Sequence, residues 1–409
     1  MMETRSVPVT KRMVWEAYKR VRANNGTAGI DAVTITKFEE KLADNLHVIW
    51  NRMSSGSYFP PSVKRVDIPK ANGRIRELGI PTVSDRTAQM IVKQYVEPRY
   101  EQIFSRNSFG YRPNKSAHQA LDQCVHNCRR YAWLIDLDIE GFFDNLQHDK
   151  MMELFENRVQ EKWIKMYVNR WLKASVSIEG EEQQRTKGTP QGGVISPLLA
   201  NIYLHYAFDE WIEKEKGWQS WERYADDIIV HCVSRAVAEN VLQQVKERLA
   251  MYGLKVNETK TKIVYCKQEN RNEDYESVSF DFLGYQFKPR KAKNKEGKVF
   301  TGYGAGISQK AKKKIRMEIR DLQIDRHTQR GIEQIAITLN AKVRGWLNYY
   351  TRYSKWAIGY IMYKINDRLI QWVRRKFRVT SKYKAIAMLK RKQQLCPKLF
   401  AHWQAGFNV

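Results

Sequence analysis

The chain has 409 residues, enough for two or three domains, and its 43% hydrophobic content excludes a disordered polymer. It carries 71 Lys and Arg residues against 44 Asp and Glu residues, for a formal net charge of +27. This excess predicts a polyanionic partner, either nucleic acid or an acidic membrane face. Because no run of 18 apolar residues occurs, we expect no membrane-spanning segment.

The positive charge is concentrated toward the C-terminus. Residues 285–409 contain 30 Lys and Arg and 6 Asp and Glu, a net charge of +24, which leaves +3 for the first 284 residues. This distribution predicts a near-neutral body followed by a basic segment that binds a polyanion. The alternative is a basic surface that serves only solubility.

The cysteines argue against a disulfide-stabilised or zinc-ribbon protein. They are odd in number and form no CxxC pair, so a reducing cytoplasm is expected. The five are Cys124, Cys128, Cys232, Cys266 and Cys396.

The N-terminal part is predicted to be helical around one β-hairpin. Amphipathic spacing predicts helices over 10–23 and about 36–53. The stretch YFPPSVKRVDIPKANGRIRELGI (58–80) alternates on both sides of a turn at residues 71–73, which predicts the hairpin. A further helix is expected over about 84–104. The basic side chains of the hairpin are Lys64, Arg65, Lys70, Arg74 and Arg76.

The rest of the chain is predicted to pass from mixed α/β structure to helices. Strands are expected at 133–139, at TKIVYC and at SFDFLGYQF, with a hairpin at WERYADDIIV (221–230) and a helix over 235–252. A Lys- and Gly-rich stretch, 288–306, is predicted to be a basic linker or exposed loop. Four helical segments follow near 308–324, 331–350, 354–378 and 381–394. This order predicts a catalytic body with a helical appendage.

Two adjacent carboxylates, Asp226 and Asp227, interrupt an apolar strand pattern. Burying either one without compensation is costly, and a divalent cation such as Mg²⁺ would resolve the conflict. An ordinary Asp-Asp turn is the alternative explanation. A second acidic strand, LIDLDIEGFFD, strengthens the metal hypothesis because it presents Asp136 and Asp138 on one face. Asp136, and Asp144 beyond the strand, are more simply explained as caps or salt-bridge partners.

Two acidic strands that meet in one sheet could hold two metal ions for in-line phosphoryl displacement. Such a site needs cations for the phosphates, which Lys70 and Arg76 of the hairpin can supply. The stretch TPQGG adds an amide side chain, Gln191, beside two glycines that let the backbone approach a nucleotide closely. A plain loop before a helix is the alternative for these glycines.

Taken together, these stretches resemble the reverse transcriptases of group II introns, the intron-encoded maturases. The resemblance covers nearly the whole chain, in motifs that occur in the family's order. They are GTAGIDAVT, VDIPKANGRIRELGIPTVSDR, SFGYRPNKSAHQAL, LIDLDIEGFFDNLQHDKM, GTPQGGVISPLLANIYLHYAFDEWI, RYADDIIV, GLKVNETKTKIV, FDFLGYQF, VRGWLNYY and PKLFAHWQAGF.

The resemblance implies a right-hand polymerase, with fingers and palm built on antiparallel sheet and an all-α thumb or maturase domain. The implied divisions are 1–83 for the N-terminal extension and fingers hairpin, 84–287 for the catalytic domain, 288–306 for the linker and 307–409 for the thumb. The family's appended endonuclease is not expected, because Cys396 is the only cysteine beyond residue 300.

The resemblance also implies roles for individual residues. Asp138, Asp226 and Asp227 would carry catalysis, and with Ile139 they would form the binding site for two Mg²⁺ ions. The expected dNTP-binding residues are Lys70, Arg76, Phe143, Gln191 and Lys260. Phe143 would exclude nucleotides with a 2′-hydroxyl, and Lys260 or Lys262 would be the general acid for pyrophosphate. The expected nucleic-acid-binding residues are Arg65, Arg112, Arg352, Lys355, Arg374 and Arg375.

The implied activity is RNA-directed DNA synthesis, combined with binding of the intron's own RNA to promote splicing and mobility. The implied partners are group II intron RNA, an RNA template with a DNA primer, dNTPs and target DNA, with no membrane. Two alternatives remain open: a maturase that assists splicing without polymerising, and a CRISPR-linked or defence reverse transcriptase. The intact Asp138, Asp226 and Asp227 argue against the first.

Overall fold

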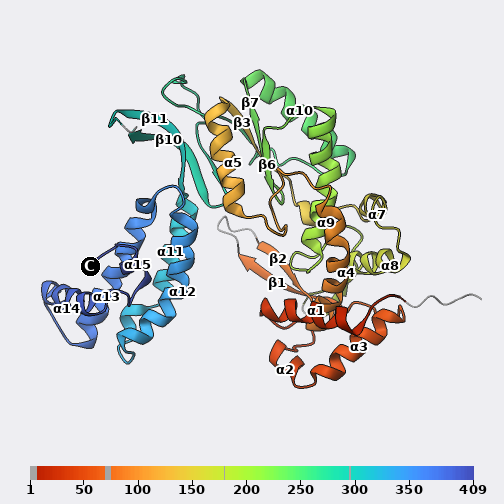
Figure 1. Cartoon of the computed structure of the whole chain (residues 1–409), viewed down its shortest axis with the longest axis horizontal. Helices are drawn as coiled ribbons and strands as arrows, with labels where there is room; N and C mark the ends of the chain where they lie inside the picture. Colours follow the sequence, from red (N-terminus) through yellow and green to blue (C-terminus); the bar gives the residue numbers. More distant parts are fainter. Residues whose placement is uncertain (1–6, 70–74, 179, 294–295) are drawn as a thin grey trace, which may run out of the picture. The chain divides into compact units, whose positions relative to one another are not determined.

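The computed structural model describes residues 7–69, 75–178, 180–293 and 296–409. Contacts within the chain divide it into two compact units. Unit 1 comprises Met1–Ala120 and Ile135–Ile263, and unit 2 comprises Leu121–Leu134 and Val264–Val409. Both are drawn in Figure 1.

The N-terminal helices of unit 1 form largely as predicted. Thr10 caps α1 (Lys11–Ala23) by accepting a hydrogen bond from the Met13 amide at 3.2 Å. The single helix expected over 36–53 is instead two, α2 (Ile35–Glu39) and α3 (Leu42–Ser54). Lys41 leaves the helical region between them, and Asn45 Nδ2 bridges the break by donating to Phe38 O at 2.8 Å. The helices α1 and α3 pack on α4 (Val83–Glu101).

The described residues of unit 1 contribute to two sheets, and the division between the units falls inside β3 and β8 of the second one. The first has the order β2-β1-β4-β5, in which β1 pairs antiparallel with β2 and parallel with β4. The second has the order β6-β7-β3-β8 and contains both predicted acidic strands. Their bounds are β1 Val63–Pro69, β2 Ile75–Ile80, β3 Trp133–Asp138, β4 Val176–Ile178, β5 Glu181–Gln183, β6 Trp221–Tyr224, β7 Asp227–Cys232 and β8 Lys262–Tyr265.

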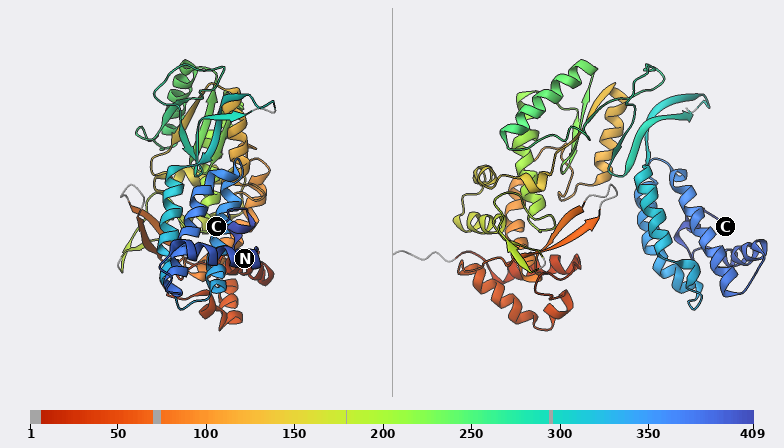
Figure 2. Two further views of the ribbon diagram at one scale, coloured as in Figure 1. Left: turned by 90° about the vertical axis from the view of Figure 1, so that its left-hand side faces the viewer. Right: turned by 180° about the vertical axis from the view of Figure 1, so that it is seen from behind.

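Helices surround these sheets, and Figure 2 shows α10 running along the second one. A long helical passage follows the Gly-rich stretch, in which α9 continues into two successive π-helical segments, η1 and η2. The remaining bounds are α5 Ala117–Arg130, α6 Phe142–Asn145, α7 His148–Glu156, α8 Lys162–Leu172, α9 Ser196–Leu204, η1 His205–Asp209, η2 Trp211–Glu215 and α10 Arg235–Met251.

Unit 2 takes in most of α5 and, from Val264 on, contains a three-stranded antiparallel sheet, β11-β10-β9, where a basic linker was predicted. The prediction of a loop over 288–306 is wrong: β10 (Tyr285–Lys293) and β11 (Val299–Ile307) pair along their full lengths, and β9 is Phe280–Phe282. The glycines that indicated a loop instead leave space for the side chain of Arg290. A Cβ at Gly306 would lie 2.7 Å from Arg290 Nη2, and Arg290 Nε donates to Gly304 O at 3.1 Å.

Helices make up the rest of unit 2, as predicted, and Figures 1 and 2 show α11 and α12 side by side. Buried Ile, Leu, Val and aromatic side chains from α11 to α15 form one core. Their bounds are α11 Gln309–Asp321, η3 Ile324–Arg326, α12 Ile332–Tyr350, η4 Lys355–Ile358, α13 Gly359–Lys376, α14 Lys382–Leu395 and α15 Ala401–Gln404.

None of the helices in the described ranges combines the length and the apolar character that crossing a bilayer requires.

A buried polar cluster joins α15 to α13. His402 Nε2 and Trp403 Nε1 both lie within hydrogen-bonding distance of Asn366 Oδ1, at 2.8 and 3.0 Å. Because that oxygen only accepts, we assign the proton of the neutral imidazole to Nε2. Burial lowers the pKa of His402 to about 3.

This depressed pKa predicts a loss of stability in mild acid. In the unfolded chain this histidine is protonated below about pH 6.5, whereas in the folded protein it is protonated only below about pH 3. The free energy of unfolding should therefore fall by about 2 kcal/mol between pH 7 and pH 5. His402→Gln should lack this component, which guanidinium unfolding at the two pH values would measure. The same substitution at exposed His47 is the control. An unchanged acid loss in His402→Gln would contradict the assignment.

Candidate active site

The two adjacent carboxylates lie at the tip of the β6–β7 hairpin, as predicted. Tyr224 pairs with Asp227, so Ala225 and Asp226 form a two-residue turn. Ala225 adopts a left-handed conformation, with φ of 57°, which is uncommon for a residue with a side chain. This tight turn brings two side chains together that a continuous strand would have sent to opposite faces.

The third predicted carboxylate, Asp138, ends strand β3, which neighbours β7 in the sheet. The segment before β8 holds its backbone: the Asp138 amide donates to Thr261 Oγ1 at 3.2 Å, and the Asn257 amide donates to Asp138 O at 2.8 Å. Lys260 Nζ lies 2.7 Å from Asp138 Oδ2. Of the two lysines considered as general acid, Lys260 is therefore the one in contact with a predicted catalytic carboxylate. Ile139 follows Asp138 and is buried.

The three carboxylates act on one another electrostatically. The pKa of Asp227 is raised to about 7, first by burial, then by the negative charges of Asp226 and Asp138, while Lys260 opposes the shift. Part of Asp227 reaches solvent, but protein atoms crowd its carboxylate. One ammonium does not balance three carboxylates. Hard oxygen ligands with surplus negative charge suit a divalent cation, so Asp138, Asp226 and Asp227 fit such an ion.

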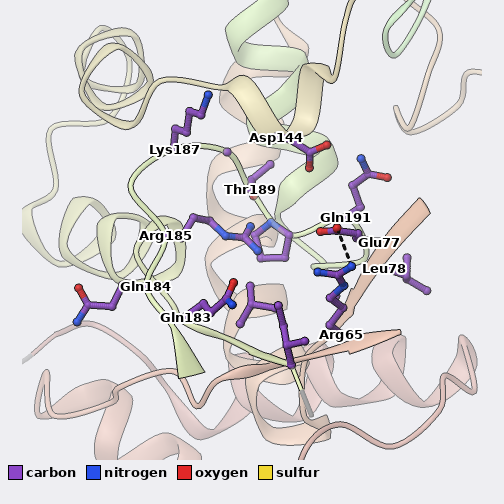
Figure 3. Close-up of a pocket in the computed structure, with 15 residues that line it drawn as sticks. Arg65, Glu77, Leu78, Asp144, Gln183, Gln184, Arg185, Lys187, Thr189 and Gln191 are labelled. Atoms are coloured by element: carbon purple, nitrogen blue, oxygen red, sulfur yellow. Dashed lines mark ion pairs between the residues drawn. The ribbon is translucent and has the colours of Figure 1, made fainter. Parts of the chain in front are cut away.

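A pocket of about 220 Å³ lies in unit 1 next to the Gln191 loop (Figure 3). Arg65 reaches into it and pairs with Glu77 Oε1 at 2.8 Å, and Arg185 extends toward it from the strand-to-loop segment after β5. Burial lowers the pKa of Arg185, which Asp144 and Glu77 counteract by attraction. The lining residues are Arg65, Glu77, Leu78, Gly79, Asp144, Val176, Ile178, Gln183, Gln184, Arg185, Lys187, Gly188, Thr189, Pro190 and Gln191.

The loop that carries Gln191 is fixed by hydrogen bonds from both sides. The Gly79 amide of β2 donates to Gln191 O at 2.7 Å. Gln89 of α4 accepts from the Ile195 amide at 3.2 Å and donates to Asp85 Oδ2 at 2.8 Å. Asp85 is buried, and burial raises its pKa to about 6. The loop is therefore attached to the β1–β2 hairpin and to α4, which holds the Gln191 backbone in one place.

Phe143 lies under the same loop. It is 9% exposed, and Phe142 packs edge-to-face against it. The Thr189 amide donates to Phe143 O at 2.8 Å, and a Cβ at Gly188 (φ 79°) would lie 2.8 Å from that oxygen. A glycine at 188 thus lets the loop rest directly on the backbone of α6.

Two of the predicted dNTP-binding residues are not placed by the structure. Lys70 lies outside the described residues, and so does the side chain of Arg76, although the Arg76 backbone pairs with Ile68 across the β1–β2 hairpin. The structure brings Asp138, Asp226, Asp227 and Lys260 together electrostatically, and it places Arg65 and Gln191 on one pocket.

The prediction that Arg112 binds nucleic acid is wrong. Arg112 is buried, pairs with Glu101 at 2.9 Å, and donates to the carbonyl oxygens of Ser105 and Ser108 at 2.5 and 2.7 Å. These contacts engage the Arg112 guanidinium inside the protein, so Arg112 stabilises the 105–112 loop.

The predicted basic residues of unit 2 are exposed, but several have acidic or carbonyl partners. Arg352 pairs with Asp122 at 2.7 Å, and Arg375 pairs with Asp325 at 2.6 Å. Arg374 donates to Thr380 O at 2.9 Å, and Lys355 is exposed. Each keeps part of its charge toward solvent, which is compatible with phosphate contact.

A second group of cations lies where β10 meets α11. Burial lowers the pKa of Lys312, and repulsion from three neighbouring cations lowers it further. The neighbours are Arg290, Lys288 and Arg316. These four residues, which we call the junction cluster, were not singled out from the sequence, because the hairpin that assembles them was predicted to be a loop.

The sequence interpretation also missed Arg185 and Lys187. Both stand in the stretch QQRTKGTPQGG, directly before the glycines, and this pair of cations beside a Gly-rich loop was the available signal. Lys187 Nζ donates to Asn145 Oδ1 at 2.9 Å. Arg185 is the one that points into the pocket.

Comparison with known proteins agrees with this geometry. Residues 68–287 match the reverse transcriptase (RNA-dependent DNA polymerase) family, and residues 312–389 match the group II intron maturase-specific domain. Protein YkfC of Escherichia coli (strain K12) is 30% identical over 311 residues, which are 67% of this chain and 79% of YkfC.

Two further relatives are encoded in introns. The group II intron-encoded protein LtrA of Lactococcus lactis subsp. cremoris is 35% identical over 192 residues, 46% of this chain and 32% of LtrA. An uncharacterised 91 kDa protein in the cob intron of Schizosaccharomyces pombe is 34% identical over 203 residues, 49% of this chain and 25% of that protein. The matches thus span a third or less of these two longer relatives. The chain belongs to the reverse transcriptase (RNA-dependent DNA polymerase) family and joins it to a group II intron maturase-specific domain, as in a group II intron reverse transcriptase and maturase.

Proposed function

We propose that the chain copies RNA into DNA for a group II intron and binds the RNA of that intron as a maturase. The observation that carries the proposal is the meeting of Asp138 from β3 with Asp226 and Asp227 from the β6–β7 hairpin, because nucleotidyl transfer needs such carboxylates at one point. The maturase-specific domain supports the second activity.

The proposed architecture is a right hand. The hairpin β1–β2 and the N-terminal helices serve as fingers and N-terminal extension (1–83), the segment 84–287 as fingers and palm, and the helices of 307–409 as thumb. The sheet β6-β7-β3-β8, which carries the carboxylates, is the palm sheet in this assignment. The β10–β11 hairpin would then join palm and thumb as a folded ribbon.

Each residue near the carboxylates has a proposed task in nucleotidyl transfer. Asp138, Asp226 and Asp227, with the Ile139 backbone, would hold two Mg²⁺ ions, which when bound supply Lewis acidity to the primer hydroxyl and the triphosphate. The primer 3′-oxygen attacks the α-phosphorus, and the bond to pyrophosphate breaks. Lys260 is the proposed proton donor to the departing pyrophosphate, since its ammonium already lies at the site.

The nucleotide is oriented by residues around the Gln191 loop. Lys70 and Arg76 of the β1–β2 hairpin are proposed to bind the triphosphate, and Gln191 to contact the nucleotide. Phe143, held against this loop through Thr189, is the proposed barrier to a 2′-hydroxyl. A rigid aromatic side chain under a fixed loop can exclude one extra oxygen by steric conflict.

The pocket beside Gln191 is proposed to receive the template strand as it enters. Arg65 and Arg185 are the cations that face it, and a nucleic-acid phosphate is the ligand that suits a pair of guanidinium groups. The exposed cations of unit 2, including Arg352, Lys355 and Arg374, are proposed to bind phosphates of the intron RNA. Target DNA is the further partner that intron mobility would require.

The first test is primer extension on an RNA template. Wild-type protein with Mg²⁺ should make DNA from dNTPs and almost no product from rNTPs, whereas Asp226→Ala should lose synthesis by at least about a thousandfold and keep intron-RNA affinity. Phe143→Ala should raise the relative use of rNTPs about a hundredfold. Tight RNA binding by a wild-type protein that extends nothing would leave the splicing-only maturase as the function.

The pocket predicts a defect in substrate binding. Arg185→Gln should raise the KM for primer–template about tenfold, because a charge-assisted hydrogen bond to a phosphate is removed, with little change in the Mg²⁺ dependence. Steady-state kinetics would measure this, and Arg158→Gln, which removes an exposed arginine elsewhere in unit 1, is the control. Equal KM values for both variants would place the template elsewhere.

The basic surface of unit 2 predicts a steep salt dependence of RNA binding. Arg378 follows the predicted contact Arg374 by four residues, and both are exposed. Replacing the two with Gln should reduce the slope of log K against log salt by about 0.7 to 0.9 for each phosphate that is no longer neutralised. Filter binding with intron RNA at several salt concentrations would give the slopes. The charge-matched control replaces Lys214 and Arg235, which pair with Glu210 and Glu239 on unit 1. A wild-type slope in the variant of Arg374 and Arg378 would contradict the assignment.

A further inference from the structure

Arg223, three residues before Asp226, is completely buried and ion-paired. Its Nε and Nη2 donate to the two carboxylate oxygens of Asp209 at 2.8 and 2.6 Å, and both side chains are 0% exposed. Taking two charges out of water costs several kcal/mol per ion, so a buried pair of this kind is seldom kept for stability alone. Its further contacts indicate what else it does.

The third nitrogen of Arg223 reaches the catalytic turn. Nη1 donates to Ala225 O at 3.0 Å and to Asn201 Oδ1 at 3.0 Å. Ala225 has a φ of 57°, in the left-handed region that is unfavourable for a residue with a Cβ atom. The carbonyl that Arg223 binds belongs to the peptide between Ala225 and Asp226. A hydrogen bond to this carbonyl restrains the ψ angle of Ala225 and the φ angle of Asp226, which are two of the torsions that shape the turn.

The opposite side of the turn is confined by backbone. A side chain at Gly110 would overlap the backbone nitrogen of Ala225, so only glycine lets the two segments approach. Asn201 Nδ2 donates to Gly110 O at 2.8 Å. The backbone of Arg223 is bound by the same loop, because its amide donates to Asn107 O at 2.9 Å and its carbonyl accepts from the Phe109 amide at 2.8 Å.

The partner of Arg223 comes from an unusual element. Asp209 ends the π-helical segment η1, which continues α9, the helix that begins just after the Gln191 loop. π-Helical turns are rare and occur often at functional sites. One helical passage therefore begins just after the proposed nucleotide contact and carries the anchor of the catalytic turn.

We propose that Arg223 is a positioning residue, which, anchored by Asp209 and Asn201, fixes the Ala225–Asp226 peptide and so aims Asp226 and Asp227 at their cation. The proposal rests on the proposed function only for the identity of these two carboxylates as cation ligands. It goes beyond that function because it assigns the buried Arg223–Asp209 ion pair a role in cation binding.

The test separates position from charge. Arg223→Lys keeps the positive charge next to Asp209, but one ammonium cannot reach Asp209, Asn201 and Ala225 together. Its Mn²⁺ affinity, measured by electron paramagnetic resonance on the full chain, should fall about tenfold or more, and the Mg²⁺ concentration for half-maximal extension should rise by a similar factor. Primer–template affinity should stay within about twofold of the wild-type value.

Two variants act as controls. Asn201→Ala leaves the Arg223–Asp209 pair intact and should weaken Mn²⁺ binding in the same direction, which covers the case that Arg223→Lys fails to fold. Arg99→Lys alters another two-pronged pair of unit 1, in which Arg99 contacts Glu161 at 2.9 and 2.6 Å. It should leave Mn²⁺ affinity unchanged, whatever it does to the melting temperature.

Wild-type Mn²⁺ affinity in folded Arg223→Lys, or in Asn201→Ala if the first variant does not fold, would overturn the proposal. An equal loss in Arg99→Lys would overturn it as well, since the effect would then follow general stability. If the wild-type protein extends no primer, the proposed function fails, but the Mn²⁺ affinities still decide whether Arg223 positions the carboxylates.

Discussion

Electrostatic repulsion among Asp138, Asp226 and Asp227 is the constraint on which the rest of unit 1 depends. Burial raises the pKa of Asp227 to about 7, and the negative charges of Asp226 and Asp138 add to the shift. A protein can hold such charges together only if the backbone that carries them is too rigid to move apart. The surrounding structure supplies that rigidity through the bonds of Thr261 and Asn257 to β3, the glycine at 110, and the buried guanidinium behind the hairpin.

The same principle of fixed backbone extends to the Gln191 loop. Hydrogen bonds tie it to β2 through Gly79 and to α4 through Gln89, and Gly188 lets it lie directly on the backbone of Phe143. The side chains proposed to meet the nucleotide thus stand on a loop that has little freedom of its own. This arrangement lowers the entropy that must be lost when substrate is bound.

Much of the fold could be predicted from the sequence because local signals agreed with the final structure. These signals extend over only a few residues each. They are the helix cap at Thr10, the alternation around the β1–β2 hairpin and the amphipathic spacing of the helices of unit 2. The predictions that failed depended on distant contacts. The β10–β11 hairpin has the composition of a loop. The position of the Arg290 guanidinium against Gly306, where a Cβ atom would clash with it, explains why a glycine lies in this strand.

The residues of the site likewise fall into those that local sequence signals could predict and those that depend on distant contacts. The motif around Asp226 and Asp227 is local, and the structure shows the hairpin expected for it. Arg112 was expected to bind nucleic acid through the family resemblance, but its burial against Glu101 could not be predicted from residue spacing. Arg223 posed the reverse problem: it looks like an ordinary strand residue until Asp209, fourteen positions earlier, is found opposite its guanidinium.

The junction cluster of Lys288, Arg290, Lys312 and Arg316 has a thermodynamic consequence for unit 2. Like charges held close together destabilise the free protein, and after burial their repulsion is the second cause of the lowered pKa of Lys312. An anionic chain lying across these cations would cancel the repulsion, so ligand binding and folding of this unit are linked. Unit 2 should therefore be at its least stable without a polyanion, and its folded population should rise with the concentration of its own ligand.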